Sequence, residues 1–591
     1  MNKLAGLKTA PPTGSPTMKT KNTKRSLAAE PFCLLLSLLM LPATSTFAQT
    51  APDAGRLLRE QPKPPAAVPA PPASVAPAVP EEAAQAEGPK VLVKGFRIKG
   101  AVLIPEAELA AQLQGSVGKE LTLDQIRAAG LLLTVYYMQK GYLARVVVPP
   151  QDIKDGIVEI QVIEGKRGAL NLDKEGERID AVRAQQFIER RLPEGAPMNL
   201  AQLGEALNIL NEQPGIEAKA SIAPGKKESE IDLNVKATGQ PLARASLGLN
   251  NQGSYGTGEA QASGGVTFNN PTGNFDALSL LLNLSQGSSF LRGDYSVAAG
   301  SSGLRLGVNA SHLNYHLVPS SFAALQSKGT ANTAGITASY PLRRRTDSNL
   351  SLTGSYDEKC MVDQTVTGET GNRRVNTLNL GLNGYTLSSL LGGGVASFGA
   401  NYVAGKSDQR NAAALATDST TRQVQGNFGK FGYNLGWLSS LPAGWNLNAA
   451  LHGQIAGKNL DSSEQMNLGG ANGVRAYPTI EASGDDGWLL NLDFGKPIND
   501  SLTAHLFLDA GGITLNHSTW ANWNAANPNL PNNYTLSGAG VGLDWRITPS
   551  ALLTASIAAP FGNNRGADAN GKNVDGYGNR ARAWITLNAT F

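Results

Sequence analysis

Residues 243–591 alternate between apolar and polar or glycine side chains with a period of two, and this pattern restricts the possible folds more than any other feature. Over residues 537–547, one set of alternate positions holds Ala539, Val541, Leu543, Trp545 and Ile547. The other set holds Gly538, Gly540, Gly542, Asp544 and Arg546. Successive side chains of a β-strand point to opposite faces of its sheet, so the pattern predicts strands with one apolar and one polar face.

The composition indicates that this sheet lies in a membrane. Charged residues make up 17% of the chain, which is below the ~25% usual in soluble domains. Beyond the N-terminal region no stretch reaches the ~20 consecutive apolar residues of a membrane helix. A closed barrel is the other structure that satisfies every backbone group in lipid. A soluble β-sandwich would share the alternation but not the rhythm of connections described next.

We expect sixteen such strands, which begin near residues 242, 260, 276, 289, 303, 331, 349, 375, 395, 422, 445, 486, 503, 536, 551 and 581. Long connections are predicted at 315–330, 359–374, 405–421, 457–485, 514–535 and 560–580. Short connections are predicted at 270–275, 342–348, 497–502 and 547–550. Outer-membrane barrels alternate short periplasmic turns with long outer loops. The predicted fold is therefore mainly β: a 16-stranded antiparallel transmembrane β-barrel over 241–591, with both ends in the periplasm.

The N-terminal region has the features of a secretory signal. Basic residues between Lys19 and Arg25 precede an apolar run at 31–41, and Ala48 follows as a cleavage point, so we predict a signal peptide at 1–48. Residues 49–89 are predicted to hold a short helix capped by Asp53, followed by a Pro/Ala-rich linker. A disordered terminus is the alternative for this helix.

Residues 90–165 and 166–240 read as two similar units, each with the order β-α-α-β-β, so a repeated α+β domain is predicted. A single α+β enzyme domain is the alternative. Neither unit shows a nucleophile elbow, a phosphate loop or a metal-binding cluster, so we expect no enzyme activity, no metal and no cofactor. The net charge of +4 is dispersed, which argues against nucleic acid as a partner.

The longest predicted connection, 457–485, is a candidate for a segment folded into the lumen. A 16-stranded barrel is wide enough for an aqueous channel. About 29 residues at ~3.3 Å each can reach into such a channel and return. Two glycine clusters and Pro478 favour a compact loop rather than a loose one.

Several motifs resemble those of the transporters of two-partner secretion, the haemolysin secretion/activation family, which belongs to the same superfamily as the BamA-type proteins. The family's Val-Arg-Gly-Tyr/Phe motif at a loop tip is matched by Gly473, Val474, Arg475, Ala476 and Tyr477. Its Phe-x-Asp-x-Gly motif on the barrel wall is matched by Phe507, Asp509 and Gly511. One position departs from the family: Ala476 replaces a glycine, and an alanine would be strained there if the position needs a positive φ.

The resemblance implies an ion pair between Arg475 and Asp509, although Arg475 could instead be one of many lumen arginines that pair with any acid. It implies that the twin front domains are polypeptide-transport-associated (POTRA) domains and that the helix near residues 51–61 can plug the barrel. The terminal Phe591 resembles the signal read by the barrel-assembly machinery.

The family's function would then be to recognise, secrete and in some cases activate a large partner exoprotein, such as a haemolysin or adhesin. The other implied partners are outer-membrane lipid and the assembly machinery, with no nucleic acid. A BamA-type insertase and a passive porin are the alternatives, and an enzyme barrel of the lipase or protease kind ranks below them.

Overall fold

The computed structural model describes residues 51–62 and 89–591. The predicted signal peptide at 1–48 and the Pro/Ala-rich part of the linker from residue 63 onward lie outside the described residues. Within the described residues, no helix has the length and apolar character needed to cross a membrane.

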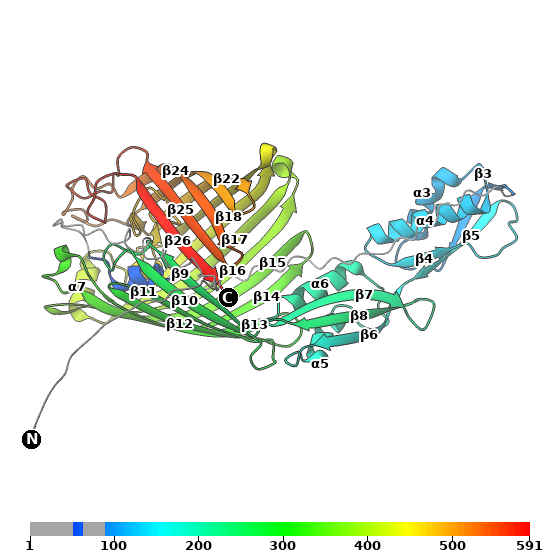
Figure 1. The fold of residues 1–591 in the computed structure, drawn as a ribbon, viewed down its shortest axis with the longest axis horizontal. Helices are drawn as coiled ribbons and strands as arrows, with labels where there is room; N and C mark the ends of the chain where they lie inside the picture. The colour runs from blue at the N-terminus through cyan, green and yellow to red at the C-terminus, as the bar shows by residue number, and fades with distance from the viewer. Residues whose placement is uncertain (1–50, 63–88) are drawn as a thin grey trace, which may run out of the picture. The chain divides into compact units, whose positions relative to one another are not determined.

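Sixteen antiparallel strands form a closed barrel, as predicted (Figure 1). In chain order they are β9 (Ala243–Asn250), β10 (Gln261–Asn269), β11 (Ala277–Ser285), β12 (Ser288–Ala298), β13 (Arg305–His316), β14 (Lys328–Arg344), β15 (Ser348–Thr365), β16 (Gly368–Ser388), β17 (Gly394–Gln409), β18 (Gly426–Leu441), β19 (Trp445–Ala456), β22 (Asp486–Asn499), β23 (Leu502–Thr514), β24 (Asn533–Thr548), β25 (Ala551–Pro560) and β26 (Arg582–Thr590). The last strand pairs with the first, with Leu587 opposite Leu249. Closure leaves no sheet edge exposed to lipid.

The two faces of the barrel strands separate as the alternation predicts. On β11, Leu280, Leu282 and Leu284 are each more than 40% exposed and face outward, whereas Asn283 is 1% exposed and faces the interior. On β24, Val541 and Leu543 are exposed on the outer face in the same way. An apolar exterior around a polar lumen is the arrangement that a barrel in lipid requires.

The prediction of a long loop at 359–374 is wrong. Strands β15 and β16 continue through it, paired on both sides of one register shift at Asp363/Gln364, with Cys360 opposite Arg374, and only Val366 and Thr367 connect them. In this stretch most outward-facing positions are polar or charged, and Arg374 forms an ion pair with Glu358. The apolar alternation that marks a strand in lipid is therefore lost, although the backbone pairing goes on.

The region before the barrel folds as two α+β units in the predicted order. The first holds β1 (Val91–Val93), β2 (Gly95–Lys99), α3 (Glu106–Leu113), the 3-10 turn η1 (Gln114–Ser116), β3 (Lys119–Leu121), α4 (Leu123–Gln139), β4 (Ala144–Val147) and β5 (Ile157–Glu164). The second holds β6 (Lys166–Glu175), α5 (Ala181–Glu189), α6 (Leu200–Asn211), β7 (Ile216–Pro224) and β8 (Glu230–Gly239). The sheet orders are β2-β5-β4 and β6-β8-β7, so each unit has the same three-stranded topology.

Local sequence explains the helices of these units. Helix α4 begins at a capping box in which the Thr122 side chain accepts from the Gln125 backbone and the Gln125 side chain accepts from the Thr122 backbone. Its buried positions, Ile126, Leu133 and Tyr137 among them, recur at helical spacing and pack on the sheet. The second unit's core also includes Phe275, from a barrel turn, whose ring meets Phe187 edge to face at 5.9 Å.

Candidate functional site: the lumen loop and its anchors

The segment 457–485 leaves β19 at Ala456, rejoins the barrel at Asp486 and is compact throughout. It holds the 3-10 turn η5 (Ser462–Glu464) and a small hairpin of β20 (Met466–Asn467) and β21 (Ser483–Gly484). Residues 459–466 are all buried. A surface loop would leave these polar residues in water, so their burial places the loop against other protein groups.

A tight turn presents the motif at the loop tip. The backbone N–H of Val474 donates to the Leu468 carbonyl at 2.7 Å, and that of Gly473 donates to the Gly470 carbonyl at 3.0 Å. A side chain at position 473 would clash with the Leu468 carbonyl, so the close approach of the two backbones requires glycine there. Val474 and Tyr477 are buried in an apolar cluster with Leu468.

Arg475 and Asp509 form a bidentate ion pair inside the barrel. Arg475 Nε lies 2.9 Å from Asp509 Oδ2, and Nη2 lies 2.8 Å from Oδ1. The backbone N–H of Arg475 also donates to Asp509 Oδ2, at 3.0 Å. Two parallel charge-assisted bonds fix direction as well as distance, which a lysine ammonium would not do.

Three further groups hold Arg475: Asp493, Trp584 and Phe507. The sequence motifs include Phe507 but give no role to Asp493 or Trp584. Asp493 on β22 accepts from Nη1 at 3.1 Å, and the Trp584 indole on β26 donates to the Arg475 carbonyl at 2.8 Å. The Phe507 ring lies under the guanidinium, 3.4 Å from its central carbon to the ring centroid. The loop tip is therefore tied to three wall strands, β22, β23 and β26.

Ala476 causes no backbone strain, because it is not among the residues with positive φ. Its methyl group is buried over Gly538 on β24, where an added Cβ would lie 2.6 Å from the Ala476 Cβ. The space that alanine needs is thus provided by a glycine on the facing strand. The positive-φ residues of this loop other than glycine are Ile480, at 68°, and Ala482, at 58°.

Gly511, the last residue of the wall motif, lies under the loop. A Cβ at this position would lie 2.8 Å from Leu468 Cδ2 and 2.9 Å from the Trp488 carbonyl. The glycine lets the apolar cluster of the loop reach the wall of β23.

Acidic residues secure both ends of the loop. Glu481 accepts from the Asn564 side chain and the Val574 N–H, both at 2.8 Å, in the outer connection before β26. Burial raises the pKa of Glu481 to about 7. At the other end, burial alone would raise the pKa of Glu464, but the ammonium groups of Lys359 and Lys430 hold it at about 2.

The predicted N-terminal helix is present as α2 (Ala54–Arg59), capped by Asp53, and it contacts the inside of the barrel. The Ala54 N–H donates to Asp363 on β15 at 2.8 Å. Ala54 and Leu57 are buried among apolar side chains of the barrel strands, including Leu313. The alternative of a disordered terminus is wrong for these residues.

Arg373 on β16 joins this helix to the lumen loop. Its guanidinium lies 3.0 Å from Asp53 of the helix cap, 2.8 Å from Asp363 of the wall and 2.9 Å from Asp461 of the loop. The Ser462 hydroxyl donates to Asp53 at 2.8 Å. One cation therefore forms ion pairs with carboxylates from three separate parts of the chain.

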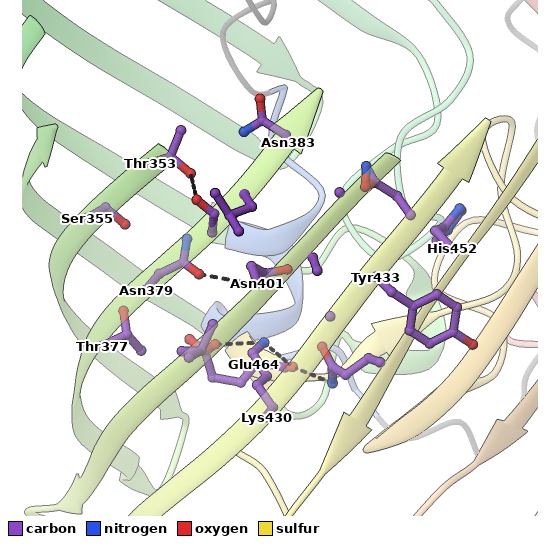
Figure 2. Close-up of a pocket in the computed structure, with 18 of the residues that line it drawn as sticks. Thr353, Ser355, Thr377, Asn379, Asn383, Asn401, Lys430, Tyr433, His452 and Glu464 are labelled. Atoms are coloured by element: carbon purple, nitrogen blue, oxygen red, sulfur yellow. Dashed lines mark hydrogen bonds and ion pairs between the residues drawn. The ribbon is translucent and has the colours of Figure 1, made fainter. Parts of the chain in front are cut away.

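Strands β15 to β19 border an open polar cavity of about 570 Å³ (Figure 2). Its lining includes many amide and hydroxyl side chains, such as Thr353, Thr377 and Asn379, together with the charged residues Asp357, Lys359, Lys430 and Glu464. The Asn401 side chain donates to Asn379 Oδ1 at 2.9 Å. Lys430 and Glu464 mark the end of the cavity where the loop crosses it.

Phe591 follows the last strand and is 73% exposed, while its backbone exchanges hydrogen bonds with Ala245 on β9. Among the described residues, no group of three or more His, Cys, Asp or Glu side chains is arranged to hold a metal ion.

Comparison with known proteins identifies relatives over most of the chain. The chain is 28% identical over 471 residues to the heme/hemopexin transporter protein HuxB of Haemophilus influenzae, covering 77% of this chain and 81% of HuxB. It is 26% identical over 440 residues to the hemolysin transporter protein ShlB of Serratia marcescens, covering 71% and 75% of the two chains. The solved structure of CdiB from Escherichia coli superimposes with a TM-score of 0.66 at 20% identity, covering 88% of this chain and 94% of CdiB.

Family models agree with these relatives. Residues 91–165 match the POTRA domain of ShlB type. Residues 228–545 match the haemolysin secretion/activation protein ShlB/FhaC/HecB. The chain therefore belongs to the haemolysin secretion/activation family and is an outer-membrane transporter of two-partner secretion, with its POTRA region in the periplasm.

Proposed function

We propose that this chain exports a large partner exoprotein through the barrel lumen, and that Arg475 and Asp509 fix the lumen loop during this work. One observation carries the proposal. Helix α2 and the lumen loop occupy part of the lumen, and both are held there by ion pairs with the same residue, Arg373. A passive porin would not need a helix and a loop that can be displaced from its lumen.

The front domains would capture the unfolded exoprotein by strand addition. Strands β2 and β4 are the edges of the first three-stranded sheet, and β6 and β7 are the edges of the second. An edge strand has backbone donors and acceptors that an extended peptide can pair with. Capture by backbone pairing tolerates many side-chain sequences, as an exporter of a long chain requires.

The exoprotein would pass along the polar wall of the cavity after α2 leaves the lumen. Amide and hydroxyl groups such as those of Asn379, Asn401 and Thr377 can exchange hydrogen bonds with a passing backbone. These uncharged groups would not retain a charged segment, and the charged lining residues include both signs, Lys359 and Lys430 beside Asp357 and Glu464. Because nucleotides are absent from the periplasm, folding of the exoprotein outside the cell would provide the direction.

The loop tip would remain anchored while the helix leaves. Arg475 is shielded from water and paired with a carboxylate that is itself almost fully buried. Removing one partner of a buried pair leaves the other charge unpaired, at a cost of about 3–5 kcal/mol. The anchored tip would hold the loop in one position while a chain passes, whereas a loosened tip would let the loop move in and out of the lumen.

Two further partners follow from the barrel surface. The exposed apolar side chains of β11 and β24 suit the lipid of the outer membrane. The exposed Phe591 suits recognition by the barrel-assembly machinery during insertion.

Deleting the gene and comparing proteins in the medium and in the periplasm tests this function. We expect one large protein to disappear from the medium and to accumulate in the periplasm, and complementation with the wild-type gene to restore its export. Unchanged secretion, with only small-solute uptake altered, would instead support the porin.

A further inference from the structure

We infer that His505 is a positioning residue for the Arg475 lock, defined as Arg475, Asp493 and Asp509. His505 does not touch Arg475; it acts by holding Asp493 in the orientation that Arg475 needs. This inference rests on the proposed role of the lock in export, and the experiment below separates the two.

The backbone around His505 leaves room for its ring to reach sideways. On β23, His505 lies directly opposite Gly495 of β22 and Gly542 of β24. A Cβ at Gly495 would lie 3.4 Å from His505 Cε1, and one at Gly542 would lie 3.5 Å from the His505 Cβ. Both are ordinary van der Waals distances, so the imidazole lies between the two neighbouring strands without crowding from either facing position.

The two ring nitrogens face two carboxylates. Nδ1 is hydrogen-bonded to Asp493 Oδ1 at 2.7 Å, and Nε2 lies at ion-pair distance, 3.2 Å, from Asp544 Oδ2 without hydrogen-bond geometry. A neutral imidazole has a single N–H, so one of its nitrogens would turn a lone pair toward a carboxylate. The geometry therefore points to an imidazolium that contacts both carboxylates as a cation.

The charged groups around His505 form one continuous chain across four elements. Asp493 of β22 uses Oδ1 for His505 and Oδ2 for Arg475 of the loop. On the other side, Asp544 of β24 also accepts from the Thr554 hydroxyl of β25, at 2.7 Å. Each oxygen of Asp493 thus has its own cation, and the carboxylate cannot rotate without breaking one contact.

Loss of the imidazolium would leave Asp493 and Asp544 as neighbouring anions without a cation between them. Asp493 could then turn from Arg475 while Arg475 keeps Asp509. The lock would be loosened without being broken, so the expected defect is weaker than that of Arg475→Ala. A residue that served only barrel packing would not act through Arg475.

The test measures single-channel currents of the purified full chain in planar bilayers for His505→Gln, alone and combined with Arg475→Ala. The control is His312→Gln, because His312 lies exposed on the outer face of β13. We expect His505→Gln to raise the frequency of channel opening roughly five- to tenfold over wild type and over the control. In the Arg475→Ala background it should add nothing, because its effect passes through Arg475.

Nuclear magnetic resonance of the ¹⁵N-histidine-labelled protein provides a second readout that does not depend on export. We expect both ring nitrogens of His505 to be protonated in the wild type at neutral pH. A neutral ring, an opening frequency equal to that of His312→Gln, or a full additional effect in the Arg475→Ala background would each overturn the inference. If the wild-type gene exports no protein, the proposed function fails, while the currents and the spectra still decide the role of His505.

Discussion

At the scale of single residues, the loop tip depends on charges that have little access to water. Asp509 is 2% exposed and receives three hydrogen bonds from Arg475. In open solvent such a pair would contribute about 0–1 kcal/mol. Because both groups are shielded here, removing either one leaves the other as a buried charge without this partner, which destabilises the loop.

Replacing Arg475 or Asp509 by alanine should reduce secretion at least tenfold, because about 3–5 kcal/mol of loop anchoring is lost. Arg475→Lys should fail to restore export, since an ammonium cannot make the two parallel bonds. The measurement is exoprotein in the medium, normalised to the amount of assembled barrel. Arg546→Ala, at an exposed arginine on β24, is the control and should secrete normally. Normal secretion by both lock variants would exclude the pair from the mechanism.

The contact between Ala476 and Gly538 yields a second residue-scale prediction. Gly538→Ala would bring two methyl groups to 2.6 Å and should lower both secretion and thermal stability. Adding Ala476→Gly should restore part of the loss. The rescue is only partial because the new methyl would also lie 2.8 Å from the Ala559 carbonyl. Equal defects in the single and double variants would show that the two positions are not coupled.

At the scale of elements, the helix α2 and the lumen loop form one electrostatic unit. Arg373 lies within 3.0 Å of a carboxylate from each, and of Asp363 from the wall. Without this cation, three carboxylates would face one another in a site shielded from water. The helix would then be the easiest of the three to release, because it is the shortest element and the other two are held elsewhere.

Arg373→Ala should therefore open the channel. We expect a several-fold rise in the ion conductance of the purified protein, measured in planar bilayers. Arg374→Ala is a matched control, since Arg374 is the next residue and pairs with Glu358 on the outer face of the barrel. If Arg373→Ala raised the ion conductance no more than Arg374→Ala does, other contacts would be sufficient to retain the helix.

The sequence predicted the strands of the barrel better than the contacts of the helix and loop inside it. Alternation and connection lengths predicted sixteen strands, because lipid on one side and water on the other impose opposite polarity on adjacent positions. The extension of the β15–β16 hairpin was missed, because charged pairs such as Arg374 and Glu358 replace apolar side chains at its outward-facing positions. Where both faces of a strand contact water, its side chains do not alternate between apolar and polar, so the sequence gives no sign of the strand.

The candidate site was predicted in part, and only with help from the family resemblance. Arg475 and Asp509 lie in recognisable motifs, so their contact could be anticipated. The role of Arg373 could not be anticipated, because its partners Asp53 and Asp461 are far from it in sequence and no motif links the three residues. The fit of Ala476 against Gly538 likewise depends on two strands brought together by closure of the barrel.

At the scale of the whole molecule, α2 and the lumen loop occupy part of the barrel lumen, and we expect α2 to leave it during export. A disulfide between the helix and the loop tests this most directly. Gly55 lies against the Ser462 side chain, and a Cβ there would lie 2.8 Å from the Ser463 backbone nitrogen, so a small shift of the loop is needed for Gly55→Cys and Ser462→Cys to form a disulfide in a Cys360→Ser background.

The decisive measurement is the fraction of exoprotein secreted by this variant before and after reduction. Our account predicts that the oxidised protein is assembled but does not secrete, and that a reductant restores export toward the level of the Cys360→Ser parent. Undiminished secretion with the disulfide intact would mean that the exoprotein does not pass through the space that α2 occupies.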